Sequence, residues 1–330
     1  MFFTKGRLVL TAIILVLVYF ILLYYAPESI TGHRDGNMWL FLPKILFLAI
    51  TSAVGSVFII IYLFRRDYLS SLLNSFNRYK YYLKQLIKRD FMTKYRKSIL
   101  GVLWSLLNPL LTMLVMSLVF SYFFRFQIPE GKFPVYLLSG MILYSFLNES
   151  TTLAMTSIIA SEGVIRKIYV PKYMFPLSRV ISSLVNLGFS LIAFFFVVTI
   201  TGSPFYWTMF LIPLPILYLF LFSLGVAMLL SSLAVFFRDL TYLYGVFMLM
   251  LMYFTPIIWP ITMLDPDSIL PLIIGLNPLF QFISYFRDIT MWGVVPDLWT
   301  NLVCIGYALT SLCVGSYVFM RQQNRFILSL

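Results

Sequence analysis

Four adjacent polar residues, Tyr95-Arg96-Lys97-Ser98, combine two cations with two hydroxyl groups. They lie between a basic segment and a long apolar stretch, at the depth where a membrane surface would begin. Arginine and lysine bind phosphate through charge-assisted hydrogen bonds, which are stronger where water is excluded. The cluster therefore favours binding of a diphosphate at headgroup depth. The alternative is that these cations only set the orientation of the chain in a membrane.

A second polar feature is Glu149, which follows Asn148 inside an apolar stretch. A charge at the centre of a bilayer costs roughly 3 kcal/mol on insertion scales, so such residues usually face a cavity or a partner. Glu149 is accordingly a channel, gate or subunit-contact candidate. Its carboxyl group could instead be protonated, or hydrogen-bonded to Ser150 and Thr151, and then serve packing.

The sequence lacks the motifs of catalysis, metal binding or nucleotide binding. Its one Gly-Lys pair, Gly131-Lys132, has neither the upstream glycine nor the following Ser or Thr of a GxxxxGK[ST] phosphate loop. Cys304 and Cys313 do not have CxxC spacing, and His33 is the single histidine. We therefore expect no enzyme activity, no metal and no cofactor in this chain.

The composition is that of a membrane protein. Of the 330 residues, 61% are hydrophobic and 11% are charged, against about 45–50% and 25% in soluble domains. The 24 Lys and Arg exceed the 12 Asp and Glu and leave a formal charge of +12. A basic surplus can indicate nucleic-acid binding, but in a chain mostly buried in lipid the placement of the charges decides. We expect no nucleic-acid partner, and the composition excludes a cytosolic enzyme and a disulfide scaffold.

Eight stretches have the roughly 20 apolar residues that a helix needs to cross the hydrocarbon core. They lie at 8–26, 44–64, 103–124, 134–158, 180–201, 209–236, 240–260 and 299–320. With a cytoplasmic N-terminus, most Lys and Arg fall inside, in agreement with the positive-inside rule. Those expected outside are Arg34, Lys44, Arg125, Lys132 and Arg287. We therefore expect eight transmembrane helices and two cytoplasmic termini.

The stretch from Ile269 to Trp292 resembles a ninth span, but Asn277-Pro278 interrupts it. Proline breaks the helix there, and lipid would leave the freed backbone groups unsatisfied. We therefore expect a re-entrant outer hairpin of two half-helices, Ile269–Leu276 and Pro278–Phe286. Asn277 and Pro278 would line an outer exit as channel or gate candidates. The alternative is a loop that lies flat on the outer leaflet.

A polar segment separates the second and third apolar stretches, and its pattern is helical. Apolar residues recur at steps of three and four, at Tyr79, Leu83, Leu86, Ile87 and Phe91, and a second face carries Lys80, Lys84 and Lys88. This pattern predicts an amphipathic helix on the inner membrane surface, whose lysines reach anionic lipids or a cytosolic protein. Its candidate site residues are Lys84, Lys88, Arg89 and Asp90.

The residues that follow this helix resemble a known family, the membrane permeases of two-component polysaccharide ABC exporters. That family moves O-antigen, capsule or teichoic acid chains across bacterial inner membranes. Its opening signature is matched by Arg89, Asp90, Tyr95, Arg96, Lys97, Ser98, Leu100, Gly101, Leu103, Trp104 and Pro109. The loop 163–178 is similar to the family's coupling-helix region. The resemblance covers about residues 76–330.

The resemblance implies an all-α polytopic permease of the ABC-2 type (type V-like), acting as a homodimer with two copies of a separate ATPase that binds ATP and Mg. It implies a coupling role for Ile165, Arg166, Lys167, Ile168, Tyr169 and Pro171, for which a loop that only sets topology is the alternative. It also implies that Leu100 and Gly101 lie beside the access point of a lipid-linked glycan, and that Trp104 is a channel candidate.

We therefore expect three regions: a two-helix hairpin extra to the family at 1–66, the interface helix at 67–99, and a six-span permease core at 100–330. The expected function is export of an undecaprenyl-diphosphate-type polysaccharide or teichoic acid across the bacterial inner (plasma) membrane. One alternative is the same fold exporting a drug, a lipid or a small glycolipid. Another, of a different class, is an ATP-independent lipid-linked oligosaccharide flippase or a glycan polymerase.

Overall fold

The computed structural model describes residues 79–90, 92–93, 101, 103–120, 132–167, 170–265 and 268–326. Within these ranges the chain forms helices joined by short loops and contains no strand. The predicted spans 8–26 and 44–64 lie outside the described residues. The described residues therefore cover the six predicted spans of the core, the amphipathic helix and the hairpin, in whole or in part.

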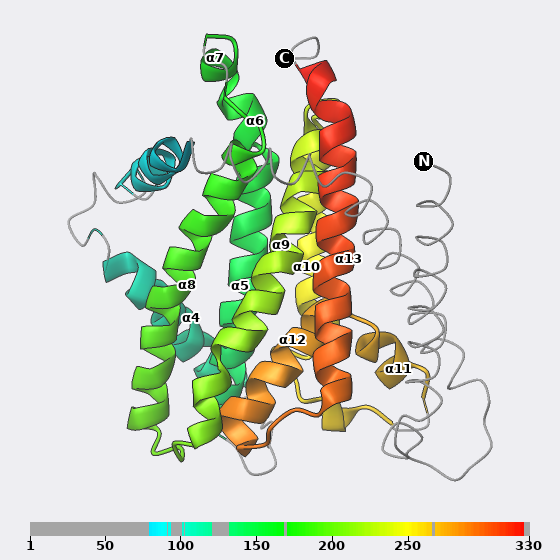
Figure 1. The fold of residues 1–330 in the computed structure, drawn as a ribbon. Helices are drawn as coiled ribbons and strands as arrows, with labels where there is room; N and C mark the ends of the chain where they lie inside the picture. The colour runs from blue at the N-terminus through cyan, green and yellow to red at the C-terminus, as the bar shows by residue number, and fades with distance from the viewer. Residues whose placement is uncertain are drawn as a thin grey trace, which may run out of the picture. The chain divides into compact units, whose positions relative to one another are not determined.

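Each of the six stretches predicted as core spans contains a helix, and these helices form the bundle in Figure 1. They are α4 (Leu103–Val119), α5 (Phe133–Met155), α8 (Met174–Ile200), α9 (Pro213–Ala234), α10 (Leu240–Phe254) and α13 (Leu298–Gln322). The stretches Met174–Ile200, Trp207–Ala234 and Leu298–Arg325 are long and apolar enough to span a membrane, whereas α4 and α10 are apolar but shorter. The protein is accordingly an all-α, multi-pass membrane protein.

Short elements connect these helices. They are α6 (Ser157–Ala160), α7 (Glu162–Ile165), α11 (Leu270–Gly275), α12 (Pro278–Arg287), the 3-10 turns Trp207–Leu211, Ile261–Met263 and Gln323–Arg325, and a π turn at Asp288–Trp292. α10 ends earlier than its apolar pattern predicts. Thr255 is already extended, because it precedes Pro256, whose ring disfavours a helical residue before it.

The predicted hairpin is confirmed as two half-helices, α11 and α12. Asn277 caps α12, because its side chain accepts a hydrogen bond from the Leu279 backbone nitrogen at 3.0 Å, and Pro278 occupies the first turn. The Asn277 amide also donates to the Thr255 hydroxyl at 2.8 Å. Leu279 and Phe282 of α12 are buried. α12 is therefore packed against other helices of the protein.

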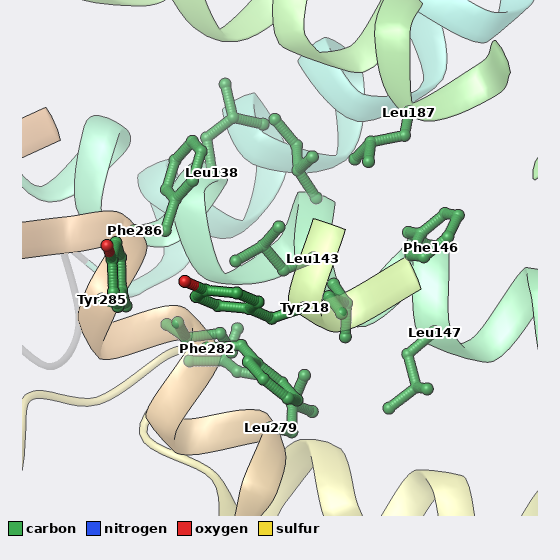
Figure 2. Packing of buried hydrophobic residues seen from close by; sticks show 14 of the residues in the cluster. Leu138, Leu143, Phe146, Leu147, Leu187, Tyr218, Leu279, Phe282, Tyr285 and Phe286 are labelled. Atoms are coloured by element: carbon green, nitrogen blue, oxygen red, sulfur yellow. The ribbon is translucent and has the colours of Figure 1, made fainter. Parts of the chain in front are cut away.

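The main apolar core gathers where α5, α9 and α12 meet (Figure 2). The ring of Tyr218 from α9 lies 6.0 Å from that of Tyr285 from α12, at an interplanar angle of 82°. Phe286 makes a similar edge contact with Phe194 of α8, at 5.3 Å. Such edge-to-face arrangements are favourable for aromatic rings. The second half-helix, α12, is thus part of the bundle's interior, whereas Leu270 and Ile273 of α11 are exposed.

α9 and α13 touch backbone to backbone. A Cβ atom on Gly315 would lie 1.9 Å from the Gly225 carbonyl oxygen, and one on Gly225 would lie 2.2 Å from the Ser311 carbonyl carbon. The Ser311 hydroxyl donates to the Phe222 carbonyl at 2.8 Å across the same contact. Small residues permit such close approach. In a membrane the hydrophobic effect does not drive helices together, so the close packing at small residues contributes to their association.

A second apolar cluster lies at the end of the bundle away from the hairpin. Its buried members are Leu86, Ile158, Ile165, Phe175, Val235, Phe319 and Phe326. They come from the helix at 79–90, from α6, α7, α8 and α13, and from the segments after α9 and α13, which Figure 1 places toward the end that carries the C-terminus. This second cluster joins segments far apart in the sequence.

The helix at 79–90 has the two faces that the sequence predicts. Leu83 and Leu86 are buried, whereas Lys80, Lys84 and Lys88 are exposed. Phe91, the last predicted apolar member, lies outside the described residues.

We expect Gly315→Ala to lower the thermal stability of the purified protein. The added methyl group has to force α9 and α13 apart at the backbone, and overpacking of this kind costs about 1–3 kcal/mol. Gly188→Ala on α8 is the matched control, because a Cβ atom there meets nothing within 4 Å. Equal melting temperatures for both variants in detergent would show that the α9–α13 contact is not tight.

Candidate functional site

The predicted diphosphate cluster Tyr95-Arg96-Lys97-Ser98 lies outside the described residues, as does Leu100. Gly101 is described and adopts a left-handed conformation with φ of +48°. Its carbonyl accepts a hydrogen bond from the Trp104 backbone nitrogen at 3.3 Å. Glycine adopts this conformation without strain, so Gly101 forms a turn immediately before α4. Trp104, at the start of α4, has 44% of its surface exposed.

Asp90, at the end of the amphipathic helix, is held by two arginines. Its Oδ1 atom lies 3.0 Å from Arg179 Nη1 on α8 and 3.1 Å from Arg89 Nη2. The Asp90 side chain is only 5% exposed, and its Oδ2 atom is buried without a hydrogen-bond partner among the described residues. A buried carboxylate depends on its cation, because an unpaired charge there is strongly destabilising.

The amphipathic helix and α8 also share an apolar contact region. Leu86 lies one turn before Asp90, and Phe175 lies one turn before Arg179, so each pair occupies one helix face. Leu86 and Phe175 both belong to the second apolar cluster. The end of the amphipathic helix is therefore positioned on α8 by burial and by an ion pair together. Lys84 and Lys88 remain exposed and face away from this contact.

The predicted coupling segment forms the tip of the loop between α5 and α8 (Figure 1). Ile165 ends the one-turn helix α7 and is buried in the second cluster. Arg166 and Lys167 are exposed, and Arg166 pairs with Glu162 at 2.7 Å. Ile168 and Tyr169 lie outside the described residues. The segment thus has an anchored apolar residue followed by two accessible cations.

The loop after this tip is fastened to the C-terminal end of α13. Pro171 is half-buried, and the next residue, Lys172, donates to the Gln323 carbonyl at 2.6 Å. The Lys172 ammonium lies 5.7 Å from the centre of the Phe326 ring. Burial lowers the pKa of Lys172 from its ordinary value. The coupling segment therefore connects with α8, with the amphipathic helix and with the end of α13.

Glu149 on α5 finds its partner on another helix. The Asn186 amide on α8 donates to Glu149 Oε1 at 2.7 Å. The hydroxyls of Ser150 and Thr151 donate to the Leu147 carbonyl instead, at 3.1 Å and 2.6 Å. These two hydroxyls therefore donate to the backbone of α5 rather than to Glu149. Glu149, which is partly buried, therefore joins α5 to α8.

Arg287, which the sequence predicts on the outer side of the membrane, has a buried side chain. It is 2% exposed at the end of α12. Its guanidinium donates to the carbonyls of Tyr136, Pro256 and Ile257 at 3.0, 2.7 and 3.3 Å and to the Ser139 hydroxyl at 3.2 Å. Within the described residues, its charge is thus met by oxygen dipoles and no carboxylate lies within 4 Å.

Tyr136 and Gly140 on α5 shape the space that Arg287 fills. The guanidinium carbon lies 3.4 Å from the centre of the Tyr136 ring, a cation–π contact. A Cβ atom on Gly140 would come within 2.9 Å of Arg287 Nη2. A cavity of about 220 Å³ lies beside them, lined by Tyr136, Pro260, Ile261, Thr262, Phe280, Ser284, Arg287 and Trp292. Arg287 therefore ties α12 to α5 and to the turn after α10.

A signal in the sequence could have identified Arg287. It lies inside the apolar stretch that ends at Trp292, and a charge in such a stretch faces the protein interior as a rule. The same rule identifies Glu149. The acceptors of Arg287 are mostly backbone carbonyls, which leave no residue pattern.

The chain is similar to ABC-2 type transporters and to proteins of polysaccharide export. The sequence model of the ABC-2 type transporter family matches residues 81–291. An O-antigen export system permease protein from Klebsiella pneumoniae is 31% identical over 246 residues, which cover 73% of this chain and 92% of that protein. One from Myxococcus xanthus is 26% identical over 253 residues, 77% of this chain and 96% of its own length. A polysialic acid transport protein from Escherichia coli is 21% identical over 257 residues, 78% of this chain and 99% of its own length.

We expect Arg287→Lys to destabilise the protein. Lysine cannot present the planar fork that reaches several oxygens at once, and hydrogen bonds to a charged group contribute about 1.5–3 kcal/mol. Arg238→Lys is the control, because Arg238 is exposed in the loop between α9 and α10. Thermal unfolding in detergent should show a loss for Arg287→Lys alone. Equal melting temperatures would mean that the hydrogen bonds of Arg287 to the surrounding carbonyl oxygens do not stabilise the hairpin.

Proposed function

Because the chain belongs to the ABC-2 type transporter family, we propose that it is the membrane permease of an exporter that carries a polysaccharide out of the cytoplasm. The observation that carries this proposal is the match to O-antigen export permeases over more than nine-tenths of their own length. A polysialic acid transport protein aligned over nearly its whole length extends the similarity to a second polysaccharide. This similarity favours a polysaccharide, including a teichoic acid, over a drug or a small lipid.

The proposed substrate is linked to a polyprenyl diphosphate, and it reaches the protein from the inner leaflet. Arg96 and Lys97, with the hydroxyls of Tyr95 and Ser98, would bind the diphosphate. Leu100 and Gly101 would form the access point, and the left-handed turn at Gly101 supports a sharp change of direction there. Trp104 would lie on the path just beyond it.

Energy would come from a separate ATPase, in two copies on a permease homodimer, with ATP and Mg bound by that partner. The exposed Arg166 and Lys167 are suited to an acidic cleft of the ATPase, while Ile165 fixes the same segment in the second cluster. A movement imposed on this tip would pass to the amphipathic helix through the cluster and the Asp90–Arg179 pair. The lysines at 84 and 88 would keep that helix on anionic lipids.

The substrate would leave at the hairpin end, with the protein in the bacterial inner membrane and both termini in the cytoplasm. Asn277 and Pro278 set the break between the two half-helices and so the shape of the hairpin. Glu149 would contribute to transport by holding α5 and α8 in a fixed relative position through its hydrogen bond with Asn186. The two predicted N-terminal spans, within residues 1–66, would be an addition to the six-span core.

Two double variants test this proposal in one experiment, with the tagged permease expressed beside its ATPase in the native host. Arg166→Ala with Lys167→Ala should lower the amount of ATPase that co-purifies, because the cations that contact it are gone. Arg96→Ala with Lys97→Ala should retain the ATPase but lower surface polysaccharide, because only substrate binding is affected. Both amounts are measured by immunoblotting at equal permease levels.

The contradictory results are equally distinct. If the wild-type permease retains no ATPase, and its deletion leaves surface polysaccharide normal, the proposed function is wrong. Normal export by the Arg96 and Lys97 double variant would contradict the diphosphate role while leaving the permease assignment intact. Undiminished ATPase recovery with the Arg166 and Lys167 variant would place the coupling contact elsewhere.

A further inference from the structure

The C-terminal end of α13 carries a cavity that the proposed transport path does not use. Its volume is about 370 Å³, and it is lined by Tyr317, Val318, Arg321, Gln322 and Arg325. Two of these five residues are arginines, and two others carry a hydroxyl and an amide. A cavity with this lining suits a small anion-bearing group.

The spacing of the polar residues gives the cavity one basic wall. Tyr317 and Arg321 lie one turn apart on the same face of α13, and Arg325 ends the 3-10 turn that follows it. All three are exposed. Arg321 reaches the Tyr317 hydroxyl only at 3.5 Å, the limit of a hydrogen bond. No carboxylate in the described part of the chain lies within ion-pair distance of Arg321.

The depth of the cavity indicates which molecule brings an anionic group. The stretch Leu298–Arg325 is apolar enough to cross a membrane, and the two arginines stand at its end, where long basic side chains reach lipid headgroups. Val318 offers an apolar wall on the same helix. We propose that this cavity binds the headgroup of an anionic membrane lipid, phosphatidylglycerol, whose phosphate carries the net negative charge that Arg321 and Arg325 would meet.

The binding chemistry does not depend on what the protein exports. Only the assignment of the site to the inner leaflet rests on the proposed function, because that proposal places the C-terminus in the cytoplasm. Free phosphate has the same anionic chemistry, so it is the source that has to be distinguished from a lipid. Cations that merely set topology would show no preference among lipids.

Native mass spectrometry of the purified full-length protein in a zwitterionic detergent tests the proposal. The protein is titrated separately with phosphatidylglycerol, with phosphatidylcholine and with inorganic phosphate. Phosphatidylglycerol should bind at least several-fold more tightly than phosphatidylcholine. Arg321→Gln with Arg325→Gln should weaken its binding by about tenfold, as expected for lost charge-assisted contacts. Arg238→Gln is the control and should bind it as the wild type does.

Three results would overturn the proposal. Phosphatidylglycerol binding that is unchanged in the double variant would mean that the cavity is not the site. Equal binding of the two lipids by the wild-type protein would mean that no anionic headgroup is recognised. Displacement of phosphatidylglycerol by millimolar inorganic phosphate would identify a free-anion site instead. If the double variant does not purify as a single species, Arg321→Lys serves instead, with weaker lipid binding expected because its planar fork is lost.

Discussion

Lipid offers no hydrogen bonds, so polar side chains in this bundle need partners within the protein, and several of them find a partner on another segment. Asp90 is paired with Arg179, Glu149 with Asn186, and Asn277 with Thr255, and each pair connects two elements. These contacts act in addition to the close α9–α13 packing at Gly225 and Gly315. These pairs therefore contribute to the positions of the helices relative to one another.

The two ends of the bundle meet this constraint in different ways. At the hairpin end, Arg287 is surrounded by carbonyl oxygens and a tyrosine ring, an arrangement that fixes α12 against α5. At the other end, Asp90 and Arg179 form an ion pair above an apolar cluster that includes Ile165 of the coupling segment. The two ends therefore differ in the groups that meet the buried charge: backbone carbonyls around Arg287, and a carboxylate–guanidinium pair between Asp90 and Arg179.

Much of the fold follows from sequence patterns that are local. Apolar length predicts the six core helices, the Asn277-Pro278 pair predicts the hairpin break, and the spacing of Leu83, Leu86 and the lysines predicts the two faces of the amphipathic helix. The partners of the polar residues do not follow. Arg179 is distant from Asp90 in the sequence, and the acceptors of Arg287 are mainly backbone carbonyls, which every residue carries. The glycine contact between α9 and α13 likewise depends on how two separate helices cross.

The Asp90–Arg179 pair joins the amphipathic helix to α8, and under the proposed function transport depends on this pair. A charge exchange tests it directly, with polysaccharide export measured in cells that express the ATPase partner. Asp90→Arg and Arg179→Asp should each abolish export, because each buries two like charges at one point. The two substitutions together should restore much of it. Normal export by either single variant, or a double variant no better than the worse single one, would contradict the claim.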